Sequence, residues 1–541
     1  MSSSVLAVSS GLPPSPTAAA RPSPWILDRG RDLLLFVATP FLIVPLVAIA
    51  TRIWTPQTLY AVAIFGALGH HLPGMMRAYG DRELFARFRT RFIVSPLVLV
   101  GICTASAFID PSLSAIVLVT YVWGVWHGLM QTHGFLRIYD GKVGSNDRRT
   151  VRLDQAMCIV WFGAGTLFSD RAVHHVFQEF YMAGGPQVGT AGVHALRVAA
   201  GVCVALVTVA FTANAIARTR AGRAPSPVKL LLIGTGISYW WYSNLIVNNL
   251  LLSALLFELF HDTQYLSIVW VFNRRRVMSG SGVDTATRFI FRNRAPLVLL
   301  YVGLVAAYGS LRFIHLPQDA LNRVMTATLA ASALLHFYFD SFIWKMKERS
   351  TRASLGLAGG TADSKGRGFG GLVPVGLRWA ALVLPIAWLG TSFGRGEALQ
   401  VRKMESLGLE FPRYALAQHN LAIALASEGQ TEAAIAATRR ALTLEHEDGG
   451  LIADARHNLA ALLVDTAKQQ LQAGAPDRAR APLREAATLR PNLATALRDE
   501  GVQFVGAGQP GNAALSLQAA LVLDPADAIA RALLERVSAR R

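Results

Sequence analysis

Long apolar segments alternate with short polar loops through residues 1–394 of the chain. We identify eleven such segments of about 17–25 residues, the length that a helix needs to cross the hydrocarbon core of a bilayer. They lie near 32–51, 58–78, 92–109, 114–137, 155–169, 192–216, 229–247, 250–272, 295–313, 324–344 and 372–392. This pattern predicts an all-α fold in which residues 28–394 form a polytopic transmembrane helical bundle of about 11 spans.

Residues 395–541 have a different pattern, in which short helical segments rich in leucine and alanine recur. The segment His419-Asn-Leu-Ala-Ile-Ala-Leu425 returns as His457-Asn-Leu-Ala-Ala-Leu-Leu463, and Gly474 and Gly508 lie 34 residues apart. A helix–turn–helix period of this length resembles the tetratricopeptide repeat family. The resemblance implies an α-solenoid whose concave surface binds a protein partner, with repeats near 414–447, 454–492 and 493–526. A generic alanine-rich helical bundle is the alternative interpretation.

Composition supports a membrane protein and excludes two other classes. Hydrophobic residues make up 52% of the chain, charged residues make up 16%, and the mean hydropathy is +0.36. Such a chain is too apolar for an ordinary soluble enzyme or a disordered protein. Residues 1–27 begin with a segment rich in Ser, Pro and Ala that lacks the features of a cleaved signal peptide, so we expect a disordered cytoplasmic tail there.

The net charge of +18 arises entirely within residues 1–394, because residues 395–541 contain 17 basic and 17 acidic side chains. Only five basic residues of the apolar part fall on one side of the predicted membrane, namely Arg52, Arg171, Arg197, Arg312 and Arg323. Since basic loops face the cytoplasm, the N-terminus is predicted to be cytoplasmic and the C-terminal repeats periplasmic, in a bacterial-type inner membrane. Basic loops between apolar spans also argue against a nucleic-acid partner.

Six of the thirteen histidines lie in the cytoplasmic halves of four spans that run in the same direction. They are His70 and His71 in the second span, His127 and His133 in the fourth, His261 in the eighth and His336 in the tenth. Ionisable side chains are costly inside a membrane, so a layer of them at one depth indicates a functional site. We therefore predict that these histidines are metal ligands. A haem site, a proton or substrate pathway, and helix packing alone are the alternatives.

Carboxylates and a tyrosine accompany the histidines at helical spacing. Asp340 lies one turn after His336, and Tyr265 lies one turn after His261, which is itself followed by Asp262. We predict that Asp262, Asp340 and Tyr265 are the catalytic groups, with the carboxylates either binding the metal or orienting its ligands. Imidazole and carboxylate without thiolate favour iron, manganese or zinc.

Four further polar side chains are predicted to bind substrate. Arg77 and Arg137 follow the histidines of the second and fourth spans at the cytoplasmic surface, where each guanidinium can hold an anionic lipid headgroup. Gln131 shares a helix face with His127, and Gln264 precedes Tyr265. The two arginines also fit a simpler role as determinants of topology.

A polytopic protein with a histidine cluster facing the cytoplasm is similar to two groups of membrane oxygenases. The membrane desaturases and hydroxylases use two irons and oxygen on lipid-like substrates, although their HxxxH and HxxHH boxes are absent from this chain. The membrane carotenoid-cleaving oxygenases use a histidine-bound iron in a helical bundle. These resemblances imply one or two irons and oxidative chemistry on a lipid-soluble substrate.

The sequence thus predicts an integral membrane metalloprotein, an iron-dependent oxidoreductase whose repeats bind a protein partner. Its other ligands would be membrane lipids or a lipid-soluble substrate. Two alternatives remain open. The polar groups within the spans can form the ion or substrate pathway of a transporter or assembly factor. The histidines can instead be axial ligands of a haem in an electron-transfer protein.

Overall fold

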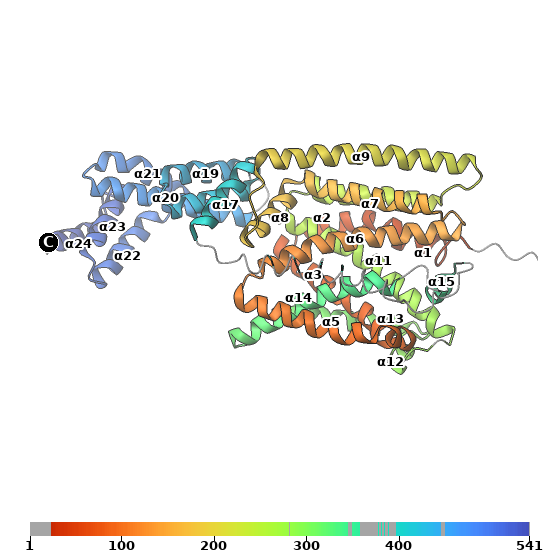
Figure 1. Cartoon of the computed structure of the whole chain (residues 1–541). Coiled ribbons are helices and arrows are strands. Elements are labelled where there is room, and N and C mark those ends of the chain that lie inside the picture. The colour runs from red at the N-terminus through yellow and green to blue at the C-terminus, as the bar shows by residue number, and fades with distance from the viewer. Residues whose placement is uncertain are drawn as a thin grey trace, which may run out of the picture.

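The computed structural model describes residues 23–280, 282–344, 349–357, 397–444 and 449–539, together with Leu377, Ala380, Leu384 and Trp388. Every regular element of these residues is a helix, which confirms the all-α prediction. The helices form a bundle and an array of shorter helices that extends from one end of it (Figure 1).

The bundle begins with a broken segment, α1 (Arg29–Asp32), η1 (Leu33–Val37) and α2 (Thr39–Ala50). Its other elements are α3 (Pro56–Gly69), α4 (His71–Gly80), α5 (Arg82–Ile109), α6 (Ser114–Lys142), α7 (Arg148–Phe168), α8 (Asp170–Met182), α9 (Gly189–Arg220), α10 (Pro227–Trp241), η2 (Tyr242–Ile246), α11 (Leu250–Met278), α12 (Thr285–Ile290), α13 (Pro296–Gly309), η3 (Ser310–Phe313), α14 (Asp319–Ile343) and α15 (Arg349–Ser354).

Four helical stretches of the described chain are long and apolar enough to cross a membrane: Pro56–Gly80, Arg82–Ile109, Gly189–Arg220 and Pro296–Phe313. The pair Arg29–Val37 and Thr39–Ala50, bent by 50°, would make a fifth. The helix Gly189–Arg220 buries none of its most apolar window against the rest of the protein. Apolar surface that is exposed in this way is compatible with a location in a membrane.

Each of the first ten predicted spans coincides with a helix or a broken helix, whereas most of 372–392 lies outside the described residues. The number eleven therefore stays a prediction. The helices α6, α11 and α14 are long enough to cross a membrane, at 29, 29 and 25 residues, but they do not qualify as apolar spans on their own. These three helices carry His127, His261 and His336, and their polar side chains face one another inside the bundle.

Two glycines bring the backbones of α3 and α13 together beside the histidines. A Cβ atom at Gly69 would lie 2.6 Å from the carbonyl oxygen of Val305, and one at Gly309 would lie 2.1 Å from that of Phe65. Neither position has room for a side chain, and small residues of this kind permit close helix packing in membranes. The contact fixes the end of α3, where His70 begins the next turn.

A buried lysine joins three other helices of the bundle. The Nζ atom of Lys229 on α10 lies 2.6 Å from Oδ2 of Asp140 on α6 and 2.7 Å from Oδ1 of Asp154 on α7. All three side chains are at most 1% exposed. Lys229 stands at the start of the predicted span 229–247, and its charge is matched inside the protein.

The second part of the protein consists of helices that pack in consecutive pairs. They are α17 (Glu397–Glu410), α18 (Ala415–Ser427), α19 (Thr431–Leu444), α20 (Gly449–Gln472), α21 (Pro476–Leu489), α22 (Leu493–Gly506), α23 (Pro510–Leu523) and α24 (Ala528–Ser538). Gly429, Gly474 and Gly508, with φ of 77°, 74° and 69°, make the turns within the pairs α18–α19, α20–α21 and α22–α23. Only glycine adopts this conformation readily. Each predicted repeat contains one pair, and the assignment to the tetratricopeptide family stays a prediction.

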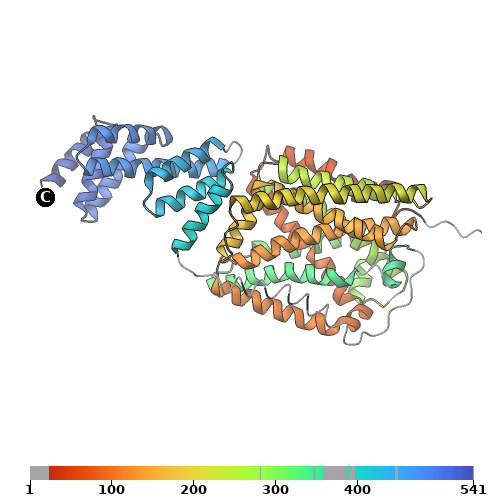
Figure 2. The ribbon, with the colours of Figure 1, turned by 45° about the horizontal axis from the view of Figure 1, so that its top comes forward.

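The helix α17 packs on α8, at the end of the bundle where α9 begins (Figures 1 and 2). The hydroxyl of Tyr181 donates to Glu410 at 3.0 Å, and the backbone N–H of Gly189 donates to the same carboxylate oxygen at 2.8 Å. The ammonium of Lys403 donates to the carbonyl oxygen of Tyr181 at 2.5 Å. Burial raises the pKa of the Tyr181 phenol, and the Glu410 carboxylate raises it further, so the phenol stays a donor. A buried polar network therefore joins the two parts.

The end of the segment 1–27 contacts the bundle. Residues 1–22 lie outside the described part of the chain, but Ile26 is buried against the bundle. The backbone N–H groups of Ile26 and Leu27 donate to the carboxylate of Asp32 at 2.6 and 2.8 Å. Tyr139 on α6 donates to the same carboxylate at 2.9 Å. Hydrogen bonds through Asp32 therefore connect this segment to α6.

Candidate metal centre

Four histidines from four segments of the chain meet in the interior of the bundle. His70 lies between α3 and α4, His127 lies on α6, His261 on α11 and His336 on α14. All four are at most 8% exposed, and one ring nitrogen from each lies within 4.8 Å of the others. The spans of this group are separated by long stretches of sequence, so only the tertiary fold brings the rings together.

The two shortest contacts between ring nitrogens meet at one atom. Nε2 of His336 lies 3.1 Å from Nε2 of His70 and 3.1 Å from Nε2 of His127. The ring of His261 is edge-on to those of His70 and His127, with centroid separations of 5.1 and 5.0 Å. A ring nitrogen has a single in-plane direction, which holds either a proton or a lone pair. One hydrogen bond therefore cannot satisfy all the nitrogens that face this point.

The spacing of the nitrogens fits the coordination of a metal ion. With metal–nitrogen bonds of about 2.0–2.1 Å, two neighbouring ligands of one ion lie roughly 3.0–3.4 Å apart. The 3.1 Å separations fall within that range. Four neutral imidazoles with their lone pairs turned inward would hold a first-row ion such as iron, manganese or zinc.

Asp262 supports this arrangement from the other side of the His70 ring. Its Oδ1 atom lies 2.8 Å from Nδ1 of His70, an ion-pair distance rather than an aligned hydrogen bond. A carboxylate there favours the tautomer with the proton on Nδ1, which leaves the lone pair of Nε2 facing the other histidines. Glu258, one turn before Asp262 on α11, has a carboxylate oxygen within 4.8 Å of a ring nitrogen of His70 and of a carboxylate oxygen of Asp262, so these three side chains form a second group that could hold an ion.

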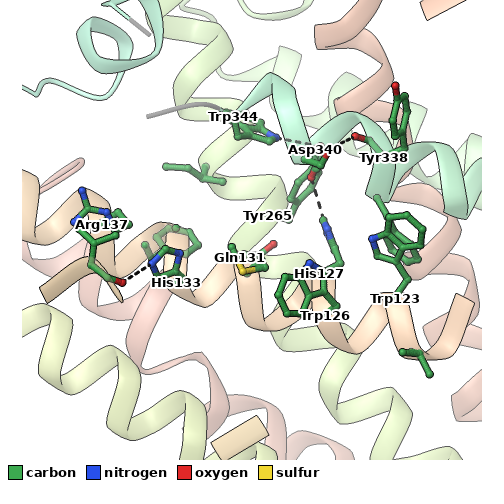
Figure 3. Close-up of a pocket in the computed structure, with 18 of the residues that line it drawn as sticks. Trp123, Trp126, His127, Gln131, His133, Arg137, Tyr265, Tyr338, Asp340 and Trp344 are labelled. Atoms are coloured by element: carbon green, nitrogen blue, oxygen red, sulfur yellow. Dashed lines mark hydrogen bonds and ion pairs between the residues drawn. The ribbon is translucent and has the colours of Figure 1, made fainter. Parts of the chain in front are cut away.

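Asp340 lies beside the histidine group and keeps one oxygen turned toward it (Figure 3). Its Oδ1 atom accepts hydrogen bonds from the hydroxyl of Tyr265 and from the indole N–H of Trp344, both at 3.1 Å. Its Oδ2 atom lies 3.9 Å from Nε2 of both His127 and His336. The carboxylate is thus oriented by two donors and has a free oxygen next to the ligand nitrogens.

A glycine leaves space where Asp340, Tyr265 and His336 meet. A Cβ atom at Gly74 on α4 would lie 2.7 Å from the Tyr265 hydroxyl and 3.4 Å from Nδ1 of His336. Any side chain at this position would push against the site. The sequence signal for this role is the Pro73-Gly74 pair that follows His70 and His71.

The remaining predicted ligands, His71 and His133, lie outside the group of four. His71 stacks on His336 with a centroid separation of 4.9 Å, and its Nδ1 atom is 3.1 Å from the hydroxyl of Ser332. His133 lies farther along α6, where Nε2 is 3.4 Å from the carbonyl oxygen of Val151 (Figure 3). His127 and His133 diverge around α6, and the helix continues through both without the kink that a shared ion would require.

The predicted substrate-binding residues have different surroundings. Gln131 donates to the side chain of Gln264 at 3.1 Å and to the carbonyl oxygen of His261 at 3.2 Å, so this pair braces α6 against α11. Arg77 is 3% exposed and lies between the rings of Phe272 and Trp344, at 3.9 and 3.7 Å from their centroids. Its guanidinium is therefore buried and does not face the membrane surface.

A large cavity of about 1830 Å³ lies against the histidine group, mainly between α6, α7, α8 and α14. Its walls are mostly apolar and include Trp123, Trp126 and Phe337, and His127, Tyr265 and Asp340 face into it (Figure 3). Val122 and Trp126 both line the cavity and are exposed, which places an opening at the apolar surface of the bundle. Of the four residues predicted to bind substrate, Gln131 and Arg137 line the cavity, and Gln264 and Arg77 do not.

No family model matches the chain, and no curated protein matches its sequence.

Proposed function

We propose that the protein is a membrane metalloenzyme in which His70, His127, His261 and His336 bind one metal ion, and that the ion is iron. The observation that carries the proposal is the convergence of four buried imidazoles with ligand nitrogens within 4.8 Å of one another. Imidazole ligands with a nearby carboxylate are typical of iron sites that activate oxygen.

Charge balance supports one divalent ion. Glu258, Asp262 and Asp340 surround the group, and none of them forms an ion pair with Lys or Arg among the described residues. The charge of Arg77 acts on Asp340. Ionised carboxylates beside neutral histidines would leave negative charge in excess in the site, and buried unpaired charge is strongly unfavourable. A divalent cation would offset this charge.

The spacing of the rings favours a metal ion over a haem. Two histidines that bind a haem iron lie on opposite faces of the macrocycle, which separates their rings. Here Nε2 of His336 lies only 3.1 Å from Nε2 of His70 and 3.1 Å from Nε2 of His127. A porphyrin does not fit between nitrogens at these distances. The four-histidine group therefore supports the metalloenzyme proposal better than the electron-transfer alternative.

The cavity supports chemistry on a lipid-soluble substrate. Bound iron would supply oxidation there, and the residues of the chain would position the substrate and move protons. The free oxygen of Asp340 faces both the cavity and the ligand nitrogens, so it can accept a proton from a group bound between them. The Tyr265 and Trp344 donors hold Asp340 in that orientation.

Elemental analysis and a visible spectrum of the detergent-purified full-length protein test this proposal. We expect about one iron per chain and no Soret band. A protein that purifies without bound metal would contradict the metal centre, and a stoichiometric zinc ion would contradict the oxidative function. A Soret band would replace the proposal with a haem protein.

A further inference from the structure

The cavity runs along most of α6 and has chemically different ends. Its lining on this helix extends from Leu118 to Ile138, a length of about 30 Å at the rise of an α-helix. That length equals the thickness of the hydrocarbon core of a bilayer. His127 lies near the middle. At the Leu118 end the lining includes the apolar side chains of Val176, Phe177 and Phe180 from α8, which would not solvate a charge.

The other end of the cavity carries three guanidinium groups. Arg137, Arg148 and Arg152 line it, and Arg148 and Arg152 are exposed. Neither Arg148 nor Arg152 forms an ion pair or side-chain hydrogen bond among the described residues. Arg137 donates a hydrogen bond to Asn146. Guanidinium groups that converge on one end of an apolar cavity match an anionic headgroup.

The acidic side chains near this end are already paired. Asp147 caps α7, accepts a hydrogen bond from Thr150 and forms an ion pair with Arg218. Burial alone would raise the pKa of Asp147, but the hydrogen bonds from Thr150 and the charge of Arg218 outweigh it and lower the pKa to about 2. Asp140 and Asp154 both bind Lys229. These carboxylates therefore leave the three arginines available to a bound anion.

We propose that the cavity binds a single-chain anionic amphiphile, such as a long-chain carboxylate, with its headgroup at Arg137, Arg148 and Arg152 and its chain along α6 past the histidine group. From Arg137 to His127 the distance along the helix is about 15 Å, the depth of one leaflet of hydrocarbon. The position that reaches the metal centre is then far from the headgroup, toward the end of the chain. The inference about which position reacts rests on the function proposed above. The inference that the cavity binds the amphiphile does not depend on that function.

Binding of a spin-labelled stearic acid tests the headgroup site. The full-length protein is placed in nanodiscs of zwitterionic lipid, and electron paramagnetic resonance measures the immobilised fraction of the probe. We expect unlabelled stearic acid to displace the probe, and the double variant Arg148→Gln/Arg152→Gln to weaken binding roughly tenfold or more. Arg149→Gln is the matched control, because Arg149 adjoins both residues in sequence but does not line the cavity, and it should bind the probe like the wild type.

A bulky side chain placed in the cavity tests the position of the ligand's hydrocarbon chain. Gly134 lies two helical turns from His127 and lines the cavity, and a Cβ atom there meets nothing within 4 Å. Gly134→Phe should therefore fill the space between headgroup and metal centre and abolish binding. Gly101→Phe is the control, because Gly101 is an exposed helical glycine on α5 with equally open surroundings.

The outcomes separate this inference from the metal centre. Equal binding of the probe by the wild type, Gly134→Phe and the Arg148→Gln/Arg152→Gln variant would overturn the inference, whatever the metal content. Displacement of the probe by stearyl alcohol as effectively as by stearic acid would overturn the anionic headgroup. Displacement by inorganic phosphate alone would indicate a soluble anion instead of a lipid. Binding with the expected pattern in a protein without metal would support the inference and contradict only the function proposed above.

Discussion

His70 is the histidine with two potential roles, because its two ring nitrogens face different groups. Nε2 lies 3.1 Å from Nε2 of His336, and Nδ1 lies 2.8 Å from Oδ1 of Asp262. A carboxylate behind a histidine ligand fixes the tautomer and raises the basicity of the nitrogen that binds the metal. The affinity of the centre should therefore depend on a residue that is not itself one of the four ligands.

The variant Asp262→Asn tests this dependence. An amide has nearly the same shape but does not attract the Nδ1 proton of His70 as a carboxylate does. We expect metal affinity to fall about 10–100-fold, measured by competition with a chelator, while the protein still inserts and folds. Asp319→Asn, at an exposed position on α14, should leave the affinity unchanged. Equal affinities of Asp262→Asn and the wild type would remove Asp262 from the site.

Residue types and helical spacing predict part of the site. Ionisable side chains cost free energy inside a membrane, and their common depth singles out His127, His261 and His336. The structure brings these three together with His70. Sequence does not decide between the adjacent residues His70 and His71, because the choice depends on how the chain turns between α3 and α4. Nor does it reveal that Arg77 lies between the rings of Phe272 and Trp344, which are distant in the sequence.

At the scale of elements, Lys229 holds three helices together through two carboxylates. Replacing it with Met leaves Asp140 and Asp154 buried without a cation, and removal of one partner of a buried ion pair costs about 3–5 kcal/mol. We expect Lys229→Met to lower the thermal unfolding midpoint in detergent substantially. Arg220→Met, at the exposed end of α9, serves as the control and should unfold like the wild type. Unchanged unfolding of Lys229→Met would show that the triad contributes little stability.

The junction between α8 and α17 is the second element-scale feature with a measurable consequence. Glu410→Ala removes the acceptor of the Tyr181 hydroxyl and the Gly189 N–H, and an unsatisfied buried donor costs about 1–3 kcal/mol. We expect faster amide hydrogen exchange in α17 and little change in α22 and α23. Glu485→Ala removes only an exposed ion pair with Arg439 and should not change the exchange of α17. Equal exchange in all three proteins would mean that the network does not hold α17.

The same junction lies near residue 395, where the sequence pattern changes. Leu407 and Phe411 at the end of α17 are buried in a cluster with Val173 and Tyr181 of α8. Apolar periodicity identifies α17 as a helix, but it does not show which neighbour covers its apolar face. The helices from α18 onward pack chiefly on one another, so α17 belongs to the interface with the bundle as much as to the array.

At the scale of the whole molecule, the array of helices projects from one end of the bundle, and α12 and the last turns of α9 lie at the other end (Figure 1). Those last turns carry Arg218 and Arg220, and the segment that follows α12 carries Arg292 and Arg294. Since basic loops face the cytoplasm, the array is expected on the opposite side of the membrane. An alkaline phosphatase fused after Arg541 should therefore be active. Activity of a cytoplasmic reporter at the same position would contradict this topology.

The periodicity of apolar residues predicts most helices of the molecule, because hydrophobic length is a local property. It does not predict the cavity, which arises from the way α6, α8 and α14 pack at a distance from one another in the sequence. The sequence does identify the helices that line the cavity, because their polar residues interrupt otherwise apolar spans. What occupies the space between them depends on side-chain volumes across several helices.

The central claim is that four histidines hold one metal ion, and the metal content of matched single variants tests it most directly. We expect about one metal ion per chain in the wild type and in His194→Ala, since His194 lies on α9, away from the group. His261→Ala and His336→Ala should insert into the membrane normally but lose the metal, because each removes one of the converging ligands. Full metal content in His336→Ala would contradict the account, since its Nε2 atom makes the two shortest contacts of the site.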